Sequence, residues 1–472
     1  MKVLIASHNK GKINEFVNLL SDLNIEFCLL DEFEKVEEPI EYGKTLVENA
    51  LIKAKYYYDL FKLPVIADDT GLFIKGLNNE PGVHSARYSG NGEDGNRKKV
   101  LENLKSNDRS AYFETVLVYF DGKTLISSNG RLFGEIAYKE IGDMGFGYDS
   151  IFYIPSYQKT LAEIGPIEKN KISHRHNAIL EMSFKLKFLL NEITHHDYIE
   201  KLIIDVYQTS AQSIERLPGG MSNDTYLVNL GDKKKVVRIP GFSDNVYVDR
   251  FNEYESLKIV KGHDLFVQFD YFDEITGVKI SPYIEEKHEE LDYKKLSYTL
   301  EELHKNVKLD KTYEPIKQLA YYYRLNQIFD EKLDPLFNEL YQKISSYAPY
   351  LNKRPKVACH NDNQLSNFIL NKDAYRLIDF EFSGNNDPLF DYACFGNNDL
   401  SIGKKAYSIT VGRDITEEEN KVIELWYSVQ AMTWYLVASF KDATGLGESL
   451  GLDFKEIATM FLRKAENLLK KY

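Results

Sequence analysis

HNDNQLSNFIL, residues 360–370, has the pattern of a phosphate-transfer loop. In it a carboxylate, Asp362, stands five residues before an amide, Asn367, and the apolar run 368–370 that follows is typical of a short strand. Phosphoryl transfer needs a base beside the attacking hydroxyl and an oxygen ligand for the metal ion that bridges the nucleotide phosphates. Asp362 and Asn367 have the spacing of an H-x-D-x-x-x-x-N catalytic loop and fit these two roles.

A second acidic motif follows this loop. LIDFEF, residues 377–382, carries Asp379 and Glu381, which are two residues apart and therefore expected on one side of a strand end. Mg²⁺ prefers oxygen ligands and keeps several waters, so one or two carboxylates facing the phosphates suffice to hold it. Alone, either motif is also compatible with a polar turn or an ordinary strand terminus. The two motifs together, with Asn367 as a further ligand, predict an Mg²⁺ site for phosphoryl transfer.

A lobe that grips the nucleotide is expected upstream of these motifs. Residues 216–241 contain two alternating strand patterns around a Gly231-Asp232 turn, preceded by a Gly219-Gly220 loop. Glycine lets backbone N–H groups approach phosphates closely, although Gly-Gly before a strand is often only a turn. The residues predicted to serve the nucleotide are Ser222 and Asn223 in the loop, Arg238 at the end of the second strand, and Glu253 or Glu255 on the following helix as its ion partner.

These segments together resemble a known group of enzymes. LPGGMSN, VVRIPG, HNDNQLSN and LIDFEFSGNNDPLFDYA are similar to the choline/ethanolamine kinase group within the aminoglycoside-phosphotransferase-like superfamily, over about residues 197–472. The resemblance implies ATP as the phosphoryl donor and an α+β, protein-kinase-like bilobal fold for a domain placed at residues 196–472. Arg238 stands where protein kinases have a lysine, which agrees with this group.

The expected acceptor of the phosphoryl group is choline. A trimethylammonium group forms no strong hydrogen bond, so aromatic faces and a carboxylate are its natural receptor. Trp426, Gln430 and Trp434 lie on one stripe of a predicted helix, a pattern that a buried core face also produces. Trp434 is the predicted cage residue, and Asp387 is the predicted carboxylate for the head group. Ethanolamine, another amino alcohol and an aminoglycoside remain as alternatives.

Length and composition bound the possible functions. A chain of 472 residues predicts two or three domains, and 43% hydrophobic with 28% charged residues is typical of a folded protein. The net charge of −13 argues against a protein that coats nucleic acid. Three widely spaced cysteines indicate neither a disulfide framework nor a zinc site. Because no apolar run reaches membrane length and MKVLIASHNK does not fit a signal peptide, a cytoplasmic location is expected.

The first half of the chain carries its own chemistry. KVLIAS, residues 2–7, is a buried-strand pattern that continues through a polar loop into a helix, an arrangement that presents amides and lysines to an anion. In LPVIADDTGLFIKGL, residues 63–77, an apolar strand is expected to end in two carboxylates, which repel each other unless a positive ion lies between them. A polar turn between strands is the alternative. The predicted ligands are Ser7, Asn9, Lys10 and Lys12 for phosphate, and Glu41 (expected to open a helix), Asp68 and Asp69 for Mg²⁺.

Two later segments suit a ligand with an aromatic ring. GFGYDSIFYIP, residues 145–155, offers Phe146 for stacking and Asp149 for hydrogen bonding. Ser173 is the expected N-cap of a helix whose first turn contains His174 and Arg175. Basic side chains at that end oppose the helix dipole, which indicates a ligand rather than a contribution to stability.

These features resemble the inosine-triphosphate pyrophosphatase family over about residues 1–193, through SHNKGK, the Glu41 segment, VIADDTGL, PGVHSARYSG, GFGYDSIF, EKN and SHRHNA. Ser7-His8 departs from the Thr-Gly that family members more often have. The resemblance implies an α/β domain at residues 1–195 with a mixed central sheet and an active-site cleft, and a homodimer through this domain. It implies Mg²⁺-dependent hydrolysis of ITP, dITP or XTP to the monophosphate and pyrophosphate, with Asp69 as base or metal ligand. The implied substrate contacts are Thr70, Phe146, Gly147, Tyr148, Asp149, Lys169, His174 and Arg175.

Two complete sets of catalytic groups predict one chain with two enzymatic activities. The junction, residues 191–198, has no Pro/Gly/Ser-rich linker, so closely apposed domains joined by the end of a helix are expected. The alternative is that one half is a catalytically silent module that regulates the other. The sequence does not reveal why the two halves are joined or whether they communicate.

Overall fold

The computed structural model describes residues 1–472 apart from 35, 219–222, 287–289, 330, 372 and 446–451. The chain divides into two compact units, residues 1–198 with 242–246 and residues 199–241 with 247–472. The change from one unit to the other falls inside helix α6 (His195–Tyr207), and the predicted functional boundary between residues 195 and 196 stays a prediction. Within the part of the chain described, we find no helix that could span a membrane.

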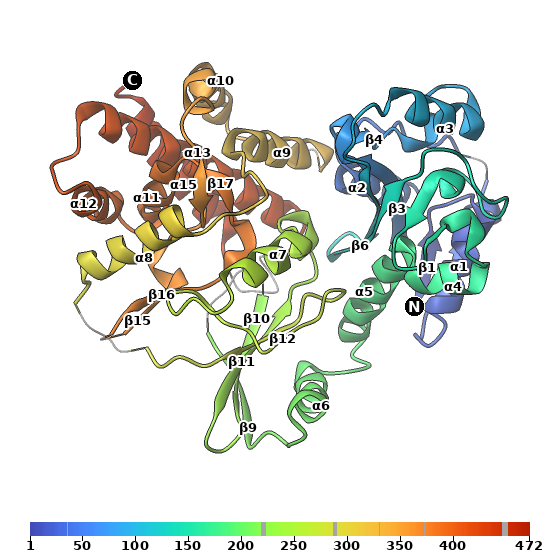
Figure 1. The fold of residues 1–472 in the computed structure, drawn as a ribbon, viewed down its shortest axis with the longest axis horizontal. Helices are drawn as coiled ribbons and strands as arrows, with labels where there is room; N and C mark the ends of the chain where they lie inside the picture. Colours follow the sequence, from blue (N-terminus) through green and yellow to red (C-terminus); the bar gives the residue numbers. More distant parts are fainter. Residues whose placement is uncertain (35, 219–222, 287–289, 330, 372, 446–451) are drawn as a thin grey trace. The chain divides into compact units, whose positions relative to one another are not determined.

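The first unit is built on a mixed sheet with the strand order β2-β1-β3-β5-β6-β7-β8, and β4 pairs with β3 (Figure 1). β1 is parallel to both of its neighbours, whereas the pairs from β3 through β8 are antiparallel. The predicted α/β fold with a mixed central sheet is therefore confirmed. Its strands are β1 (Lys2–Ile5), β2 (Glu26–Leu29), β3 (Val65–Ile74), β4 (Glu80–Gly82), β5 (Ser110–Phe120), β6 (Leu125–Ile136), β7 (Phe152–Ile154) and β8 (Lys159–Thr160), and its helices are α1 (Lys10–Leu19), α2 (Leu46–Phe61), α3 (Gly92–Asn103), α4 (Pro166–Ile172) and α5 (His174–Leu189).

Strand β3 determines where the first site lies. The prediction that this strand ends at Asp68 and Asp69 was wrong. The strand runs through them, because all ten of its residues pair with β5. Consecutive residues of a strand point to opposite faces. Asp68 accordingly contacts α1, and Asp69 contacts α2.

Two hydrophobic clusters flank the acidic pair along β3. Ile66, before the acids, belongs to a buried cluster with side chains of β1, β5, β6, α1 and α5. Leu72, after them, belongs to a second buried cluster with side chains of α3, β5 and β7. The two acids therefore lie on a rigid strand, at the point where one core gives way to the other.

Helix starts fix two further functional segments. The prediction that Glu41 opens a helix was wrong, because Glu41 lies in coil. Thr45 is the N-cap of α2 and exchanges hydrogen bonds with Glu48. α5 begins at His174 as predicted, and the Ser173 hydroxyl accepts the N–H of His176 at 3.0 Å.

The second unit has the predicted bilobal α+β fold. An antiparallel sheet with the order β12-β13-β11-β10-β9 forms one part, and helices form most of the other (Figure 1). The predicted hairpin around Gly231-Asp232 is confirmed by the pairing of β10 with β11. The strands are β9 (Ser213–Arg216), β10 (Asn223–Asn229), β11 (Lys234–Pro240), β12 (Tyr271–Phe272), β13 (Lys279–Pro282), β14 (Val357–Cys359), β15 (Phe368–Leu370), β16 (Tyr375–Leu377) and β17 (Gly384–Asn386), and the helices are α7 (Arg250–Val260), α8 (Tyr293–Asn306), α9 (Pro315–Ile328), α10 (Pro335–Leu351), α11 (Pro388–Cys394), α12 (Leu400–Val411), α13 (Glu417–Ala443) and α15 (Phe454–Leu469).

The predicted catalytic motifs of the second unit lie on irregular backbone next to short strands. The loop with Asp362 and Asn367 connects β14 to β15, the strand predicted after it. Asp379 follows β16 with a positive φ of 66°. The left-handed backbone at Asp379 does not continue the strand, and Glu381 lies in the single turn of 3-10 helix that follows. The prediction that Glu381 lies at a strand end was therefore wrong.

Candidate active sites

Three carboxylates and two lysines form the acidic centre of the first unit. Lys12 on α1 donates to Asp68 at 2.6 Å. The ammonium of Lys53 on α2 lies 3.1 Å from Glu41 and 3.5 Å from Asp69, a bridging position that the sequence did not indicate. Within the described part of the chain, these three acids do not form a group whose ligand oxygens all lie within 4.8 Å of one another. Their joint binding of one metal ion stays a prediction.

The two neighbouring aspartates have opposite pKa shifts. Burial acts to raise the pKa of Asp68, but Lys12 and Lys53 outweigh it and lower that pKa to about 2. Burial raises the pKa of Asp69, and Lys53 and the Asn49 amide, which donates to Asp69 at 3.0 Å, offset this only in part. Asp68 therefore stays an anion, whereas Asp69 is the more basic group and the better proton acceptor.

The predicted phosphate ligands gather at the start of α1. Asn9 is the N-cap of this helix, and its side chain accepts the N–H groups of Gly11 and Lys12 at 2.9 and 3.1 Å. The Ser7 hydroxyl accepts the N–H of Asn9 at 3.2 Å, and Lys10 is exposed in the first turn. The structure thus brings Ser7, Asn9, Lys10 and Lys12 to one helix N-terminus, and their contact with phosphate stays a prediction.

A cavity of about 600 Å³ is lined by Lys12 of the acidic centre and by the predicted base-binding residues, whereas Glu41, Asp68 and Asp69 do not line it. Lys12 and Thr70 line it, and the Thr70 hydroxyl is hydrogen-bonded to that of Thr115 at 2.8 Å. The structure therefore joins two groups of residues that lie far apart in the sequence. The lining also includes Phe146, Gly147, Tyr148, Asp149, Lys169, His174 and Arg175.

The loop 145–149 supplies an aromatic face and a carboxylate to this cavity. Asp149 accepts the backbone N–H of Phe146 at 2.9 Å and pairs with Lys169 at 2.5 Å. The Lys169 ammonium also lies 4.9 Å from the centre of the Phe146 ring. Because Phe146 is 57% exposed, this ring has a face available for stacking.

The first turn of α5 supplies basic groups. The His174 ring stacks on Phe113, with 4.9 Å between the ring centres. Burial and the positive charge of Arg175 lower the pKa of His174 well below its ordinary value, so the ring is neutral at neutral pH. Arg175 is held by Glu15 at 2.9 Å, a partner that the sequence did not indicate.

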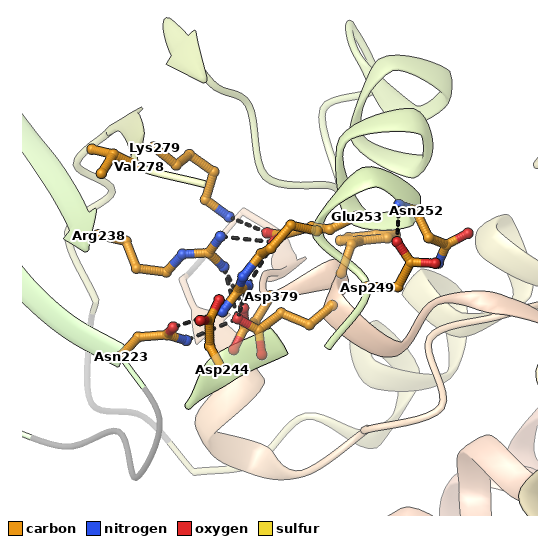
Figure 2. Close-up of polar contacts among 12 residues, drawn as sticks. Asn223, Arg238, Asp244, Asp249, Asn252, Glu253, Val278, Lys279 and Asp379 are labelled. Carbon is orange, nitrogen blue, oxygen red and sulfur yellow. Dashed lines mark hydrogen bonds and ion pairs between the residues drawn. The ribbon is translucent and has the colours of Figure 1, made fainter. Parts of the chain in front are cut away.

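Buried ions join the sheet, α7 and the metal motif of the second unit (Figure 2). Arg238 on β11 donates to Glu253 at 2.7 Å, to Asp379 at 3.1 Å and to Glu381 at 3.0 Å. Lys279, which is paired with Arg238 across β11 and β13, donates to Glu253 at 3.1 Å. One guanidinium therefore holds both the helix carboxylate and the predicted metal motif. The Arg238–Glu253 pair was predicted from the sequence, whereas the contacts of Arg238 with Asp379 and Glu381 were not.

Arg250, which the sequence did not indicate, is a second guanidinium in this cluster. It donates to Glu253 at 2.8 Å, to Glu381 at 2.5 Å and to the side-chain carbonyl of Asn223 at 2.9 Å. Glu381 Oε1 also accepts from Asn223 at 2.8 Å, so this oxygen has three donors. Asp379, whose side chain is 33% exposed, is the more accessible of the two predicted metal ligands.

Two residues predicted for this lobe lie elsewhere. Glu255, the alternative partner for Arg238, pairs with Lys258 at 2.6 Å, and both side chains are exposed. Ser222 lies outside the described residues.

The catalytic loop brings its two predicted residues together. The Asn367 amide donates to the Asp362 carboxylate at 3.0 Å. Burial and the nearby Asp379 raise the pKa of Asp362 well above its ordinary value. Burial, followed by Glu381, raises the pKa of Asp379 to about 6. Protons therefore bind to this acidic pair more readily than to ordinary aspartates.

Asp391 holds the predicted catalytic loop in place, a role that was not predicted from the sequence. Its carboxylate accepts the backbone N–H groups of His360 at 3.1 Å and Asn361 at 2.7 Å. His304 contacts the same carboxylate at 2.8 Å. The sequence did contain a signal for Asp391, because this acid stands among apolar residues after the predicted metal motif. A buried acid in such a segment needs hydrogen-bond partners.

A cavity of about 470 Å³ lies against these catalytic groups. Trp434 lines it, as expected for a cage residue. The sequence did not identify the other aromatic residues of its lining, because they come from separate parts of the chain. The cavity lining includes Asn223, Asp362, Asn367, Asp379 and Glu381, with the rings of Tyr247, Tyr313, Tyr322, Phe382, Phe390 and Trp434.

Asp387 and Trp426 occupy a different place from the one that the sequence suggested. The Trp426 indole donates to Asp387 at 2.8 Å, and both side chains are buried. Asp387 also accepts the N–H of Leu389 as the N-cap of α11 and pairs with Arg354. Neither Asp387 nor Trp426 lines the cavity. The structure therefore does not bring Asp387 together with Trp434.

Comparison with known proteins identifies relatives of the first unit. The Ham1 family model matches residues 3–184. A dITP/XTP pyrophosphatase of Thermoanaerobacter pseudethanolicus is 41% identical over 187 residues, which are 39% of this chain and 94% of that protein. A dITP/XTP pyrophosphatase of Coxiella burnetii is 44% identical over 191 residues, 39% of this chain and 95% of that protein.

The second unit has relatives of its own. The phosphotransferase enzyme family model matches residues 213–406. The structure of a choline kinase from Streptococcus pneumoniae is similar with a TM-score of 0.50 and 23% identity, and the match covers 59% of this chain and 99% of that one. This likeness shows the kinase-like fold of the second unit.

Proposed function

The N-terminal part of the chain belongs to the Ham1 family, and from this membership we propose that it hydrolyses ITP, dITP and XTP to the nucleoside monophosphate and pyrophosphate. The observation that carries this proposal is one cavity with a stacking, donor-rich lining that also includes Lys12, the partner of Asp68, and Thr70, the residue after Asp69. We also propose that the protein forms a homodimer through this unit. Measurement of its molar mass in solution tests this proposal.

Asp69 is the proposed base of this hydrolysis. Its raised pKa makes Asp69 a better proton acceptor than Asp68, whose carboxylate forms an ion pair with Lys12. Glu41 and Asp69 supply hard oxygen ligands that suit Mg²⁺, with Asp68 as a further carboxylate nearby. Mg²⁺ bound there would neutralise the triphosphate charge. Lys12 and the helix start at Asn9 then hold phosphate oxygens.

Selectivity for the base follows from hydrogen-bond polarity. Hypoxanthine and xanthine present an acceptor at position 6, whereas adenine presents an amino donor. A lining that includes Arg175 and Lys169 meets the acceptor well and leaves adenine's donor facing other donors. ATP is therefore a poor substrate. The test is product analysis with ITP and ATP: pyrophosphate from ITP supports the proposal, and orthophosphate as the primary product contradicts it.

For the second unit we propose ATP-dependent phosphorylation of an amino alcohol, with choline as the acceptor. The observation that carries this proposal is the convergence of Asp362, Asn367, Asp379 and Arg238 beside a cavity with aromatic walls. Asp362 accepts the proton of the acceptor hydroxyl, while Arg238 and Asn223 serve the nucleotide. Asp379 and Asn367, with Glu381, provide the oxygen ligands that suit Mg²⁺.

Mg²⁺ binding by the second unit is expected to depend on pH. Because the pKa of Asp379 is raised to about 6, protons compete with the metal below that pH. The apparent Mg²⁺ affinity should fall about tenfold for each further unit of acidification and level off above it. A Mg²⁺ titration of the full chain, followed by thermal shift with ADP present, measures this. Asp379→Asn should abolish the dependence, and a constant affinity between pH 5 and 7 would contradict the assignment.

Trp434→Ala is expected to raise the KM for choline about tenfold, equivalent to about 1.4 kcal/mol, because it removes a cation–π face. The KM for ATP should change little, since Trp434 lies on α13 and the nucleotide residues lie on β10 and β11. Trp434→Phe keeps a ring and serves as the matched control. Unchanged choline kinetics with a lowered melting temperature would show that Trp434 only stabilises the core.

A further inference from the structure

Helix α3 is held in the first unit by Val100 and Leu101, which pack in a hydrophobic cluster, and by polar contacts. Among its residues only Asn96 and Val100 are buried, so it has almost no apolar stripe. Asn96 accepts the N–H of Ser89 at 2.7 Å and donates to the Ser85 carbonyl at 3.2 Å. Glu93, Asn96 and Arg97 follow the spacing of neighbours on one helix face. Glu93 and Asn96 line the cavity of the first unit.

Two residues of this face hold both backbone polar groups of Gly147. The Gly147 N–H donates to Glu93 at 2.8 Å, and Arg97 donates to the Gly147 carbonyl at 2.8 Å. Arg97 is itself fixed, because it donates to Glu140 at 2.7 Å and pairs with Asp94. The position of Gly147 is therefore set from α3 through charged side chains.

Gly147 has a left-handed backbone and open space where a side chain would be. Its φ is +63°, and a Cβ added there would meet nothing within 4 Å. It lies between Phe146, the exposed stacking ring, and Asp149, which is paired with Lys169. The loop is thus fixed on one side by Asp149 and on the other by Glu93 and Arg97.

We propose that Glu93 and Arg97 are positioning residues for the purine base. They hold Gly147 so that Phe146 and Asp149 face the bound base, and they act on base affinity without touching the acidic centre. This inference rests on the pyrophosphatase function proposed above and assigns to α3 a role in substrate recognition.

The test compares variants of the full chain. Glu93→Ala and Arg97→Met should each raise the KM for ITP, and the dissociation constant of the product IMP, about tenfold, because each loses a charge-assisted hydrogen bond to the loop. The kcat should stay within about twofold of the original, because Asp69 is undisturbed. Glu93→Gln keeps an acceptor for the Gly147 N–H and should behave like the original protein. Lys98→Met and Glu102→Ala, on exposed positions of the same helix, are the matched controls.

The outcomes separate the two proposals. If the original protein releases no pyrophosphate from ITP, the proposed function fails. If it does, but Glu93→Ala leaves both the KM and the IMP dissociation constant unchanged, the positioning role fails. A loss of kcat at constant KM would also contradict this role. Glu93 is exposed, so its variant carries the test even if Arg97→Met folds poorly.

Discussion

Asp69→Asn is expected to reduce pyrophosphate release from ITP by about 10²–10⁴-fold, the contribution typical of a positioned general base. Asparagine keeps the shape of the side chain but cannot accept a proton, and it removes the negative charge that Lys53 contacts at 3.5 Å. Phosphorylation of choline by the same protein should be unchanged, because Asp362 and its neighbours belong to the other unit. Parallel assays of both products in one preparation measure this.

Asp59→Asn provides the matched control for Asp69→Asn. Asp59 lies on α2 with Lys53, and its partners are Lys55 and Lys62. This control should leave pyrophosphate release intact. Full activity of Asp69→Asn would overturn the assignment of Asp69. A folded Asp69→Asn protein that loses both activities would instead indicate that the two reactions share one site.

Asp362→Asn is expected to reduce the kcat of phosphoryl transfer by about 10²–10⁴-fold, whatever amino alcohol is supplied. The raised pKa of Asp362, caused by burial and by Asp379, suits a group that takes a proton from a hydroxyl. Pyrophosphate release should be unchanged. Initial rates of ADP formation with choline measure the effect.

Asp373→Asn, an exposed aspartate between β15 and β16, is the control for Asp362→Asn and should have no effect. If Asp362→Asn raises only the KM of the acceptor, Asp362 binds the substrate and is not the base. If the original protein carries out only one of the two reactions, the alternative of a catalytically silent module gains support.

The parts of the fold that were predictable came from local patterns. Alternating residues around Gly231-Asp232 predicted the β10–β11 hairpin, and Ser173 before His174 predicted the start of α5. Each signal lies within a few residues, so no knowledge of distant contacts was needed. The predicted end of β3 was wrong for the opposite reason. β3 continues through Asp68 and Asp69 because β5 pairs with it, and that pairing cannot be seen in the segment itself.

The candidate sites show the same limit. Motif residues were identified because they form recognisable local groups, whereas Lys53 and Arg250 act through partners that are distant in the sequence. The predicted choline cage illustrates the difference most clearly. Trp426 and Trp434 share a helical stripe in the sequence, but Trp434 lines the cavity while Trp426 is buried against Asp387. A helix face is wide enough to serve a core and a cavity together, which periodicity does not separate.

The central claim is that one chain carries two independent phosphate chemistries, and ³¹P NMR of a single reaction tests it most directly. The sample contains the full chain, Mg²⁺, ITP, ATP and choline, and it is repeated with Asp69→Asn and Asp362→Asn. We expect pyrophosphate and phosphocholine from the original protein, phosphocholine alone from Asp69→Asn, and pyrophosphate alone from Asp362→Asn. Orthophosphate in place of pyrophosphate, or the loss of both products in either folded variant, would contradict it.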